Sequence, residues 1–365
     1  MCVIDEKTAH QNHFFRSQTL RLVEFNVENL FLYLDFVNLT EGGKPNFDFE
    51  SLNEKQWQLL TTSTVGNKPL VHVRAVAKAI RDMNPDIMML CEVGGIESLA
   101  NFSKYFLNDE YEAHLIEGNS DRGIDLGYLT RRSLPFRYEL ESHKHRVIDF
   151  LYPHERLSQE TGYKNLGSAR HSSHKFSRDV LELRVFEGEA KTPCLIMLLV
   201  HLKSQLDRTR IDPGGRDRRR AELEKLVQIY DELNQRYKGV VPILLTGDFN
   251  GSAALPNPDT EFKALYARTE LKDVLEVAGV PNDERFTYMQ LSASRNRVGR
   301  NKQLDYIFVH PTLFPRVSKE DSWTFRFKDH MGRTMLLPRN LNEKKTLPSD
   351  HYPVICTLLP EPEAP

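Results

Sequence analysis

The stretch VVPILLTGDFNGS, residues 240–252, joins an apolar run to the polar sequence TGDFN. A short apolar run bounded by Gly predicts a buried strand, which places Asp248 and Asn250 directly after it. Asp and Asn are also common in turns, because their side chains bond nearby backbone groups. The stretch is therefore typical of a structural turn and of a site at a strand end. Other strands must decide between the two.

The composition is that of an ordinary globular protein, with 365 residues of which 40% are hydrophobic and 27% charged. The net charge of -2 gives no overall positive field that would favour nucleic acid. The four cysteines form no CxxC pair, which favours reduced thiols over a zinc cluster or a disulfide framework. No signal peptide and no apolar run long enough to span a bilayer is found. We expect a cytoplasmic monomer without a membrane span.

Strand-like and helix-like segments alternate along the chain, which predicts an α/β (α+β) layered fold. Apolar or alternating runs predict strands at 20–25, 85–93, 111–116, 124–130, 180–186, 194–202, 240–245, 303–309 and 352–359. Helical spacing covers 71–83, 96–107, 217–237 and a short region at 260–278. We predict one domain over 19–360 between tails at 1–18 and 361–365, with long irregular segments near 33–70, 139–178 and 311–349. Loops of this length are usually functional or disordered.

Polar residues end, or directly follow, several of the predicted strands. They are Asn26, Glu92, His201, Asp248 and Asn250. Asp305 lies within the predicted strand 303–309, and Asp350 and His351 stand just before the strand 352–359. Each has an ordinary structural explanation as a turn residue, a helix cap or a core histidine. Together they are costly at the edge of a buried sheet unless they bind something. Strand ends are also where ligand sites lie in α/β sheets.

The residue types indicate the chemistry. Carboxylates are hard oxygen ligands suited to Mg²⁺ or Mn²⁺, and amides and imidazoles suit an anionic oxygen. Together they favour metal-assisted attack of water on a phosphate ester. The chain has no GxSxG motif, no P-loop and no HExxH motif, so a serine hydrolase, a P-loop enzyme and a zinc protease are disfavoured.

Seven segments, in this order, resemble the endonuclease/exonuclease/phosphatase superfamily, which includes deoxyribonuclease I. They are EFNVENLF, DIMMLCEV, DRGIDLGYLTRR, LVHLKS, LLTGDFNGS, QLDYIFV and SDHYPVICTL, and they cover the chain from about 20 to 359. The resemblance implies a four-layer α/β/β/α sandwich, with two mixed β-sheets packed face to face and helices outside. It also implies a hydrolase of phosphate esters that depends on Mg²⁺ or Mn²⁺. The three long segments depart from the family pattern, which leaves the substrate open.

The same resemblance assigns roles around the metal and the attacking water. Glu92 is expected to hold the metal, helped by Asn26, with Asp350 beside the metal or behind its ligands. Asp248 is expected to orient and deprotonate the water, and Asn250 to bond the phosphate.

Two histidines receive phosphate roles in the same way. His351 is expected to contact a non-bridging phosphate oxygen, with Asp305 holding its imidazole. His201 is expected to steady the phosphorane or to protonate the leaving oxygen. Glu117 is expected to be the carboxylate partner of His201.

Cationic runs at 201–220 and 295–302 bear on the substrate. They are typical of solvated loops, and equally of arms that steer a phosphate-rich ligand such as DNA or RNA. Lys203, Arg122 and Arg178 are the candidate phosphate contacts. Three functions follow: a nuclease or phosphodiesterase, a phosphatase or phosphodiesterase of a small or lipid-derived phosphate, and a non-catalytic binding module. The intact metal and water residues disfavour the last.

Overall fold

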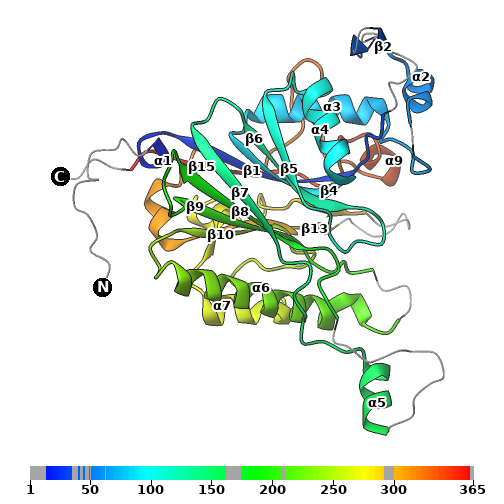
Figure 1. Ribbon diagram of the computed structural model, residues 1–365. Helices are drawn as coiled ribbons and strands as arrows, with labels where there is room; N and C mark the ends of the chain where they lie inside the picture. Colours follow the sequence, from blue (N-terminus) through cyan, green and yellow to red (C-terminus); the bar gives the residue numbers. More distant parts are fainter. Residues whose placement is uncertain are drawn as a thin grey trace.

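The computed structural model describes residues 14–34, 40–41, 44–45, 49, 51–61, 63–161, 174–206, 210–291 and 300–361. Two mixed β-sheets pack face to face, and helices cover the outer face of each (Figure 1). The predicted four-layer arrangement is confirmed.

The first sheet has the strand order β15-β1-β4-β6-β5. Its strands are β1 (Leu20–Leu30), β4 (Ile87–Val93), β5 (Tyr111–Leu115), β6 (Asp125–Arg131) and β15 (Val354–Leu358). β1 runs parallel to β4, and the other neighbours are antiparallel. The last strand along the chain, β15, therefore pairs with the first.

The second sheet has the strand order β11-β14-β10-β9-β8-β7. Its strands are β7 (Phe136–Ser142), β8 (Val180–Glu187), β9 (Leu195–His201), β10 (Ile243–Asp248), β11 (Lys272–Asp273) and β14 (Asp305–Val309). β9 and β10 are parallel and lie at the centre. Two short hairpins pair β2 (Thr40–Glu41) with β3 (Lys44–Pro45) and β12 (Tyr288–Gln290) with β13 (Arg300–Lys302).

Helices α3 (Leu70–Met83) and α4 (Gly95–Phe106) pack on the first sheet, whereas α6 (Arg216–Arg236) and α7 (Lys263–Arg268) pack on the second (Figure 1). The shorter helices are α1 (Phe14–Ser17), α2 (Glu54–Leu59), α5 (Pro153–Thr161), α8 (Val274–Val277) and α9 (Leu341–Lys344). In the described residues, 3₁₀ turns cover Pro213–Gly215, Thr260–Phe262 and Pro311–Arg316. No helix in the described part of the chain is long and apolar enough to cross a bilayer.

Alternation along β1 explains how the strands build the core and the site at once. Val23 and Phe25 pack toward the helices, whereas Leu20 and Leu22 pack in the core between the two sheets. Because side chains alternate along a strand, Glu24 and Asn26 face the other sheet. The same strand that fills the core thus delivers polar side chains to the space between the sheets.

Tyr128 on β6 connects the two sheets directly. Its hydroxyl lies 2.9 Å from the carbonyl oxygen of Leu181 on β8 and 3.0 Å from that of Met197 on β9. The ring itself is fully buried. The contact therefore fixes the spacing of the sheets by polar bonds as well as by apolar packing.

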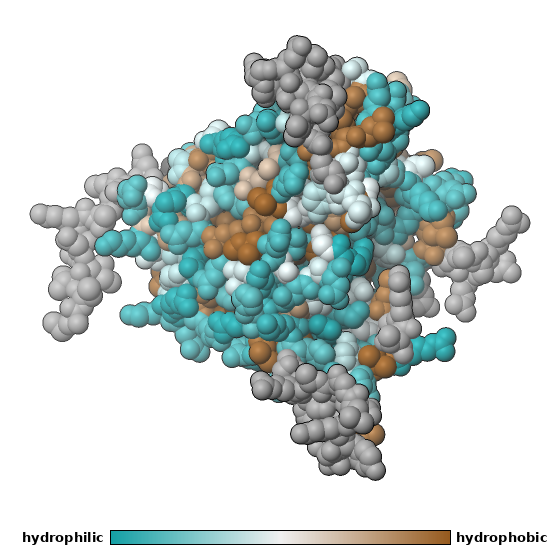
Figure 2. Space-filling view, turned by 45° about the vertical axis from the view of Figure 1, so that its right-hand side comes forward, coloured by the Kyte–Doolittle hydropathy of each residue, from teal (hydrophilic) through white to brown (hydrophobic). Residues whose placement is uncertain are grey.

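The long segments contain more regular structure than the sequence predicts. β7 runs to Ser142, so residues 139–142 are not irregular. The strand was missed because it lies at a sheet edge, where its residues are half-buried or exposed and mostly polar. α2, α5 and α9 also lie in these segments. On the face shown in Figure 2, hydrophobic residues form separate small patches in a mostly hydrophilic surface.

Candidate active site

Strand register brings three of the predicted residues into one row across the second sheet. Asp248 on β10 pairs with Asp305 on β14 and with His201 on β9. Gly247 allows this close approach, since it has a φ of 125° and an added Cβ would lie 1.9 Å from the carbonyl oxygen of Val200. Only glycine fits there, so the residue before Asp248 is fixed by the backbone.

The first sheet contributes acidic residues where its two central strands leave register. The β1–β4 pairing shifts after Asn26, and that of β4 with β6 shifts around Glu92. Glu28 and Glu92 have φ values of 50° and 66°, in the left-handed region. Non-glycine residues adopt this region at a cost and often do so at functional sites. The break in register places both carboxylates at the mouth of the site.

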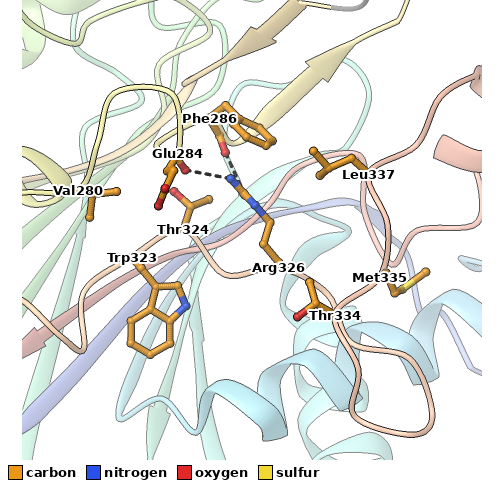
Figure 3. Close-up of a pocket in the computed structure, with 9 residues that line it drawn as sticks. All are labelled: Val280, Glu284, Phe286, Trp323, Thr324, Arg326, Thr334, Met335 and Leu337. Atoms are coloured by element: carbon orange, nitrogen blue, oxygen red, sulfur yellow. Dashed lines mark hydrogen bonds between the residues drawn. The ribbon is translucent and has the colours of Figure 1, made fainter.

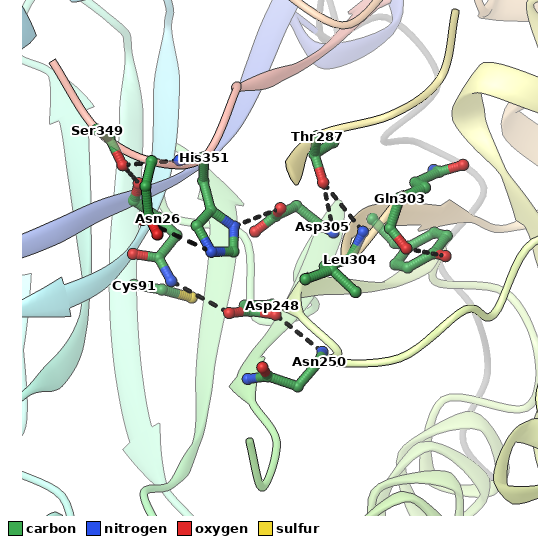
Figure 4. A network of polar contacts seen from close by, with 12 residues as sticks. Asn26, Cys91, Asp248, Asn250, Thr287, Gln303, Leu304, Asp305, Ser349 and His351 are labelled. Atoms are coloured by element: carbon green, nitrogen blue, oxygen red, sulfur yellow. Dashed lines mark hydrogen bonds and ion pairs between the residues drawn. The ribbon is translucent and has the colours of Figure 1, made fainter. Parts of the chain in front are cut away.

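A buried hydrogen-bond network links the two sheets (Figure 4). The Nδ1 atom of His351 lies 2.7 Å from Oδ2 of Asp305. The side-chain amide of Asn26 donates to Oδ2 of Asp248 at 3.1 Å, and the backbone N–H of Asn250 donates to Oδ1 at 2.8 Å. The expected pairing of Asp305 with His351 is present, and both oxygens of Asp248 are held.

The surroundings set the charges of these groups. Burial raises the pKa of Asp248 to about 7, and the neighbouring Asp305 carboxylate adds to the rise. Burial alone would lower the pKa of His351, but Asp305 and then Asp350 raise it well above its ordinary value. Burial, followed by Arg178, lowers the pKa of His201 well below its ordinary value. These shifts favour the charged form of His351 and the neutral form of His201.

A pocket of about 350 Å³ opens above this network. The predicted residues that line it are Glu92, Arg122, Arg178, His201, Asp248, Asn250, Asp350 and His351. Asn26 and Asp305 lie behind the lining and are buried. The lining residues that the sequence did not single out include Glu28, Asn29, Gln205, Tyr288, Gln290 and Lys302.

The predicted phosphate contacts differ in their surroundings. Arg122 lines the pocket and donates to Oδ1 of Asn29 at 2.7 Å. Arg178 also lines it and lies 3.3 Å from the carbonyl oxygen of Leu202. The ammonium of Lys203 bonds instead to the carbonyl oxygen of Leu206 at 3.1 Å, and Lys203 is absent from the lining. The two arginines are therefore better placed than the lysine.

The predicted pairing of Glu117 with His201 is absent. Glu117 is exposed and follows β5, the outermost strand of the first sheet, whereas His201 ends a central strand of the second. The Nδ1 atom of His201 is buried without a hydrogen-bond partner, and its Nε2 atom lies 3.5 Å from Oδ2 of Asp248. The family resemblance suggested this pair, and the buried Nδ1 atom of His201 has no carboxylate beside it.

The cationic run at 201–220 does not form a single exposed basic surface, because its arginines differ in burial and in partners. Arg219 is 2% exposed and forms an ion pair with Glu261 at 2.5 Å. Arg218 donates to the Tyr152 hydroxyl at 3.2 Å, and Arg220 is exposed beside Asp217. Residues 207–209, and residues 295–299 of the second cationic run, lie outside the described residues.

Carboxylates gather at one end of the pocket. Glu28, Glu92 and Asp350 all line it, and the backbone N–H of Asp350 donates to Oε2 of Glu28 at 3.0 Å. Within the described residues, no hydrogen bond or ion pair engages the Glu92 carboxylate. These oxygen donors fit Mg²⁺ or Mn²⁺. A second group, formed by Asp248, Asp305 and His351, has ligand atoms within 4.8 Å of one another, but Asp305 already holds Nδ1 of His351.

Glu28 could have been found from the sequence. It stands two residues after Asn26 in the segment EFNVENLF, where an alternating strand would predict it on the same face. In the structure, the left-handed φ of Glu28 and the shift in register bring its carboxylate to the pocket. The short hairpin β12–β13 supplies Tyr288, Gln290 and Lys302, and its strands are too short to show an apolar pattern in the sequence. Lys302 is the last residue of the cationic run 295–302, whereas no signal in the sequence marks Tyr288 or Gln290 as a pocket residue.

A second cavity, of about 510 Å³, lies elsewhere on the molecule (Figure 3). Arg326 crosses it and donates to the carbonyl oxygens of Phe286 and Glu284, at 3.1 and 2.9 Å. The guanidinium also lies 3.9 Å from the centre of the Phe286 ring. The main cation of this cavity is thus already engaged by the protein, and the lining has no cluster of acidic and histidine residues.

Comparison with known proteins agrees with this geometry. The model of the Endonuclease/Exonuclease/phosphatase family matches residues 65–351, so the chain belongs to that family. It is a phosphoric ester hydrolase of the metal-dependent kind. A search of the curated proteins returned no match.

Several solved structures share the fold at low sequence identity. Truncated TDP2 of Caenorhabditis elegans is 18% identical, with a TM-score of 0.52 over 93% of this chain and 98% of that one. D. rerio TDP2 complexed with a single strand DNA product is 17% identical, with a TM-score of 0.51 over 93% and 98%. The human Nocturnin catalytic domain with bound sulfate anion is 15% identical, with a TM-score of 0.51 over 93% and 94%.

Proposed function

We propose that the chain is a phosphodiesterase of the nuclease type, in which Asp248 activates a water molecule for attack on the phosphorus. The row formed by His201, Asp248 and Asp305, with Glu92 on the facing sheet, carries this proposal. In this proposal Asp248 is the base, the histidines and arginines bind the phosphate, and Glu92 is a carboxylate available to the metal. Such an arrangement suits metal-assisted hydrolysis.

Asp248 is the base in this proposal. Its pKa of about 7 matches neutral pH, where a general base works best. Asn26 and Asn250 each hold one of its oxygens, so the carboxylate keeps a single orientation. Asn26 is engaged at both ends of its amide, because its Oδ1 accepts the backbone N–H of Glu28. It therefore positions Asp248, and it reaches the metal ligands only through the backbone of Glu28.

The phosphate would be bound by cationic and neutral donors on the other side of the pocket. His351, charged and oriented by Asp305, contacts a non-bridging oxygen. Arg178 and Arg122 supply forked donors that match phosphate oxygens. Burial lowers the pKa of His201 and so favours its neutral form, which suits steadying the developing phosphorane better than supplying the proton of the leaving oxygen.

The metal would be held by Glu92, Glu28 and Asp350. When bound, Mg²⁺ or Mn²⁺ neutralises charge on the phosphate and acts as a Lewis acid. The donor set consists of carboxylate oxygens, which disfavours a thiolate-loving ion. The choice between the two ions is part of the proposal.

The substrate class rests on the pocket and its cations. A nucleic-acid end, DNA or RNA, fits a pocket lined by Arg122, Arg178 and Lys302. One structural neighbour was solved with a single strand DNA product. The second candidate is a small or lipid-derived phosphate ester. The modest volume of about 350 Å³ favours it, as does the loss of Arg219 to an internal ion pair.

We also propose a reducing compartment such as the cytosol, and a monomeric state. The described cysteines, Cys91, Cys194 and Cys356, are all free, and free buried thiols are common in such compartments.

Asp248→Asn tests the assignment. The variant keeps the shape of the side chain but cannot accept the proton, so kcat should fall by about 10²- to 10⁴-fold with an unchanged thermal midpoint. Activity is measured on a phosphodiester, a phosphomonoester and plasmid DNA, with Mg²⁺ and with excess chelator.

Wild-type activity on the diester or the plasmid, lost in chelator, is the expected pattern. Turnover of the monoester alone would favour the small-phosphate candidate instead. A stable Asp248→Asn variant with full activity would return Asp248 to the role of a turn residue.

A further inference from the structure

Two lysines reach the carboxylate end of the pocket from segments that the sequence left unassigned. The ammonium of Lys68 donates to the carbonyl oxygen of Glu28 at 2.8 Å, and the residue is 5% exposed. The ammonium of Lys344 lies 3.4 Å from Oδ2 of Asp350, and its side chain is 10% exposed. Buried lysines are rare unless they are paired.

The backbone around Lys68 is fixed from both sides. Its N–H donates to the carbonyl oxygen of Phe31 at 2.9 Å, and its carbonyl accepts the indole N–H of the buried Trp57 at 2.8 Å. The side chain therefore leaves a rigid anchor and ends beside Glu28. A neutral donor would satisfy the Glu28 carbonyl without the cost of burying a charge.

Lys344 is held by three contacts. Besides Asp350, its ammonium bonds the carbonyl oxygen of Met289 at 3.0 Å and lies 3.6 Å from the centre of the Tyr288 ring. Tyr288 lines the pocket. Lys344 thus connects β12, which forms one side of the pocket, to the carboxylate of Asp350.

The charges at this end can be compared directly. Glu28, Glu92 and Asp350 supply three carboxylates, and Lys68 and Lys344 supply two ammonium groups. Burial lowers the pKa of Lys68, and the carboxylates of Glu28, Asp350 and Glu92 oppose that shift. Three carboxylates and two ammonium groups leave a formal charge of one negative unit at this end for an incoming cation. Without the two lysines the formal charge would be three negative units, which would attract a cation more strongly and favour a second ion.

We propose that Lys68 and Lys344 are positioning residues that limit the acidic end of the pocket to one divalent ion bound with moderate affinity. This inference rests on the metal site of the proposed function. The two lysines keep the carboxylates in place by their positive charge while the metal is absent. They also oppose binding of a second ion.

The test uses Lys68→Met and Lys344→Met, which keep much of the side-chain volume and remove the charge. Mn²⁺ binding to the full chain is followed by the electron paramagnetic resonance signal of the free ion. Each variant should bind Mn²⁺ about fivefold to tenfold more tightly, and the double variant should take up a second equivalent. The thermal midpoint in excess chelator should fall in both, because the carboxylates then repel one another.

Lys68→Arg and Lys78→Met are the controls. The first keeps the charge and should restore wild-type Mn²⁺ affinity. The second removes a lysine that pairs with Asp82 on α3, and should change nothing. Mn²⁺ affinity within twofold of wild type in both methionine variants, with only the midpoint lowered, would overturn the inference and leave the lysines structural.

Glu92→Gln separates this inference from the proposed function. If that variant binds Mn²⁺ as tightly as wild type, the metal is not at this end, and the metal assignment itself fails. If it binds Mn²⁺ weakly while the lysine variants behave as wild type, only the role of the lysines fails.

Discussion

Arg219 and Arg220 are neighbours in the sequence with opposite surroundings. Arg219 is 2% exposed and paired with the equally buried Glu261, whereas Arg220 lies on the surface beside Asp217. Breaking a buried ion pair leaves an uncompensated charge and costs about 3–5 kcal/mol, while an exposed pair contributes about 0–1 kcal/mol. A cationic run therefore cannot be read as a single arm.

Arg219→Ala and Arg220→Ala make a matched pair that tests this difference. We expect Arg219→Ala to lower the free energy of unfolding by about 3–5 kcal/mol, and Arg220→Ala to change it by less than about 1 kcal/mol. Urea unfolding of both variants is the measurement. Equal stabilities would mean that Arg219 is not held by Glu261 in solution.

At the same scale, the sequence located some side chains well and others poorly. Asp248, Asp305 and His351 were found because each stands at a fixed offset from an apolar strand, and strand register then brings them together. The Glu117–His201 pair, which the family resemblance suggested, is not formed, because Nδ1 of His201 is buried without a hydrogen-bond partner.

Among the elements, the strand β10 was the clearest prediction, whereas the backbone contact near its end could not be predicted. Its apolar run marks the strand, but only the structure shows that Gly247 lies against the Val200 carbonyl of β9. β7, α2, α5 and α9 were missed because edge strands and short surface helices have little apolar periodicity. Long apolar strands and the amphipathic α3 carry that signal strongly.

Gly247→Ala should disturb the β9–β10 pair at the point where the site begins. The new Cβ would meet the Val200 carbonyl at 1.9 Å, so the strands must separate or the backbone must change its dihedral angles. We expect lower stability and a loss of kcat beyond what the lost stability explains, since Asp248 moves with the strand. Thermal unfolding and kcat, both measured well below the midpoint, check this.

Gly239→Ala is the control, because Gly239 also has a positive φ, of 69°, but its added Cβ would meet nothing closer than 3.8 Å. If both variants lose the same stability and keep the same kcat, the close approach at Gly247 has no bearing on catalysis.

For the whole molecule, Asp179 predicts a pH dependence of folding. Burial raises its pKa to about 7, although the Ser142 hydroxyl donates to Oδ2. Its Oδ1 is buried without a partner. A carboxyl group with a raised pKa favours the folded state while it is protonated. The stability from that state is complete below pH 4, near the unfolded pKa, and is lost as pH rises to about 7.

Asp179→Asn should remove this part of the pH dependence. Between pH 5 and pH 8, the difference between wild type and variant in the free energy of unfolding should change by roughly 2–3 kcal/mol. Wild type should lose more stability than the variant as pH rises. Urea unfolding at several pH values gives both curves, and parallel curves would contradict the raised pKa.

The pairing of β1 with β15 determines when, during synthesis of the chain, the first sheet can be completed. β15 covers the edge of β1, and His351 stands just before β15. A growing chain that has reached β14 holds Asp248 and Asp305 but neither His351 nor the strand that closes the first sheet. Since domains fold as units during synthesis, the first sheet and the candidate site come together only after β15 has been made.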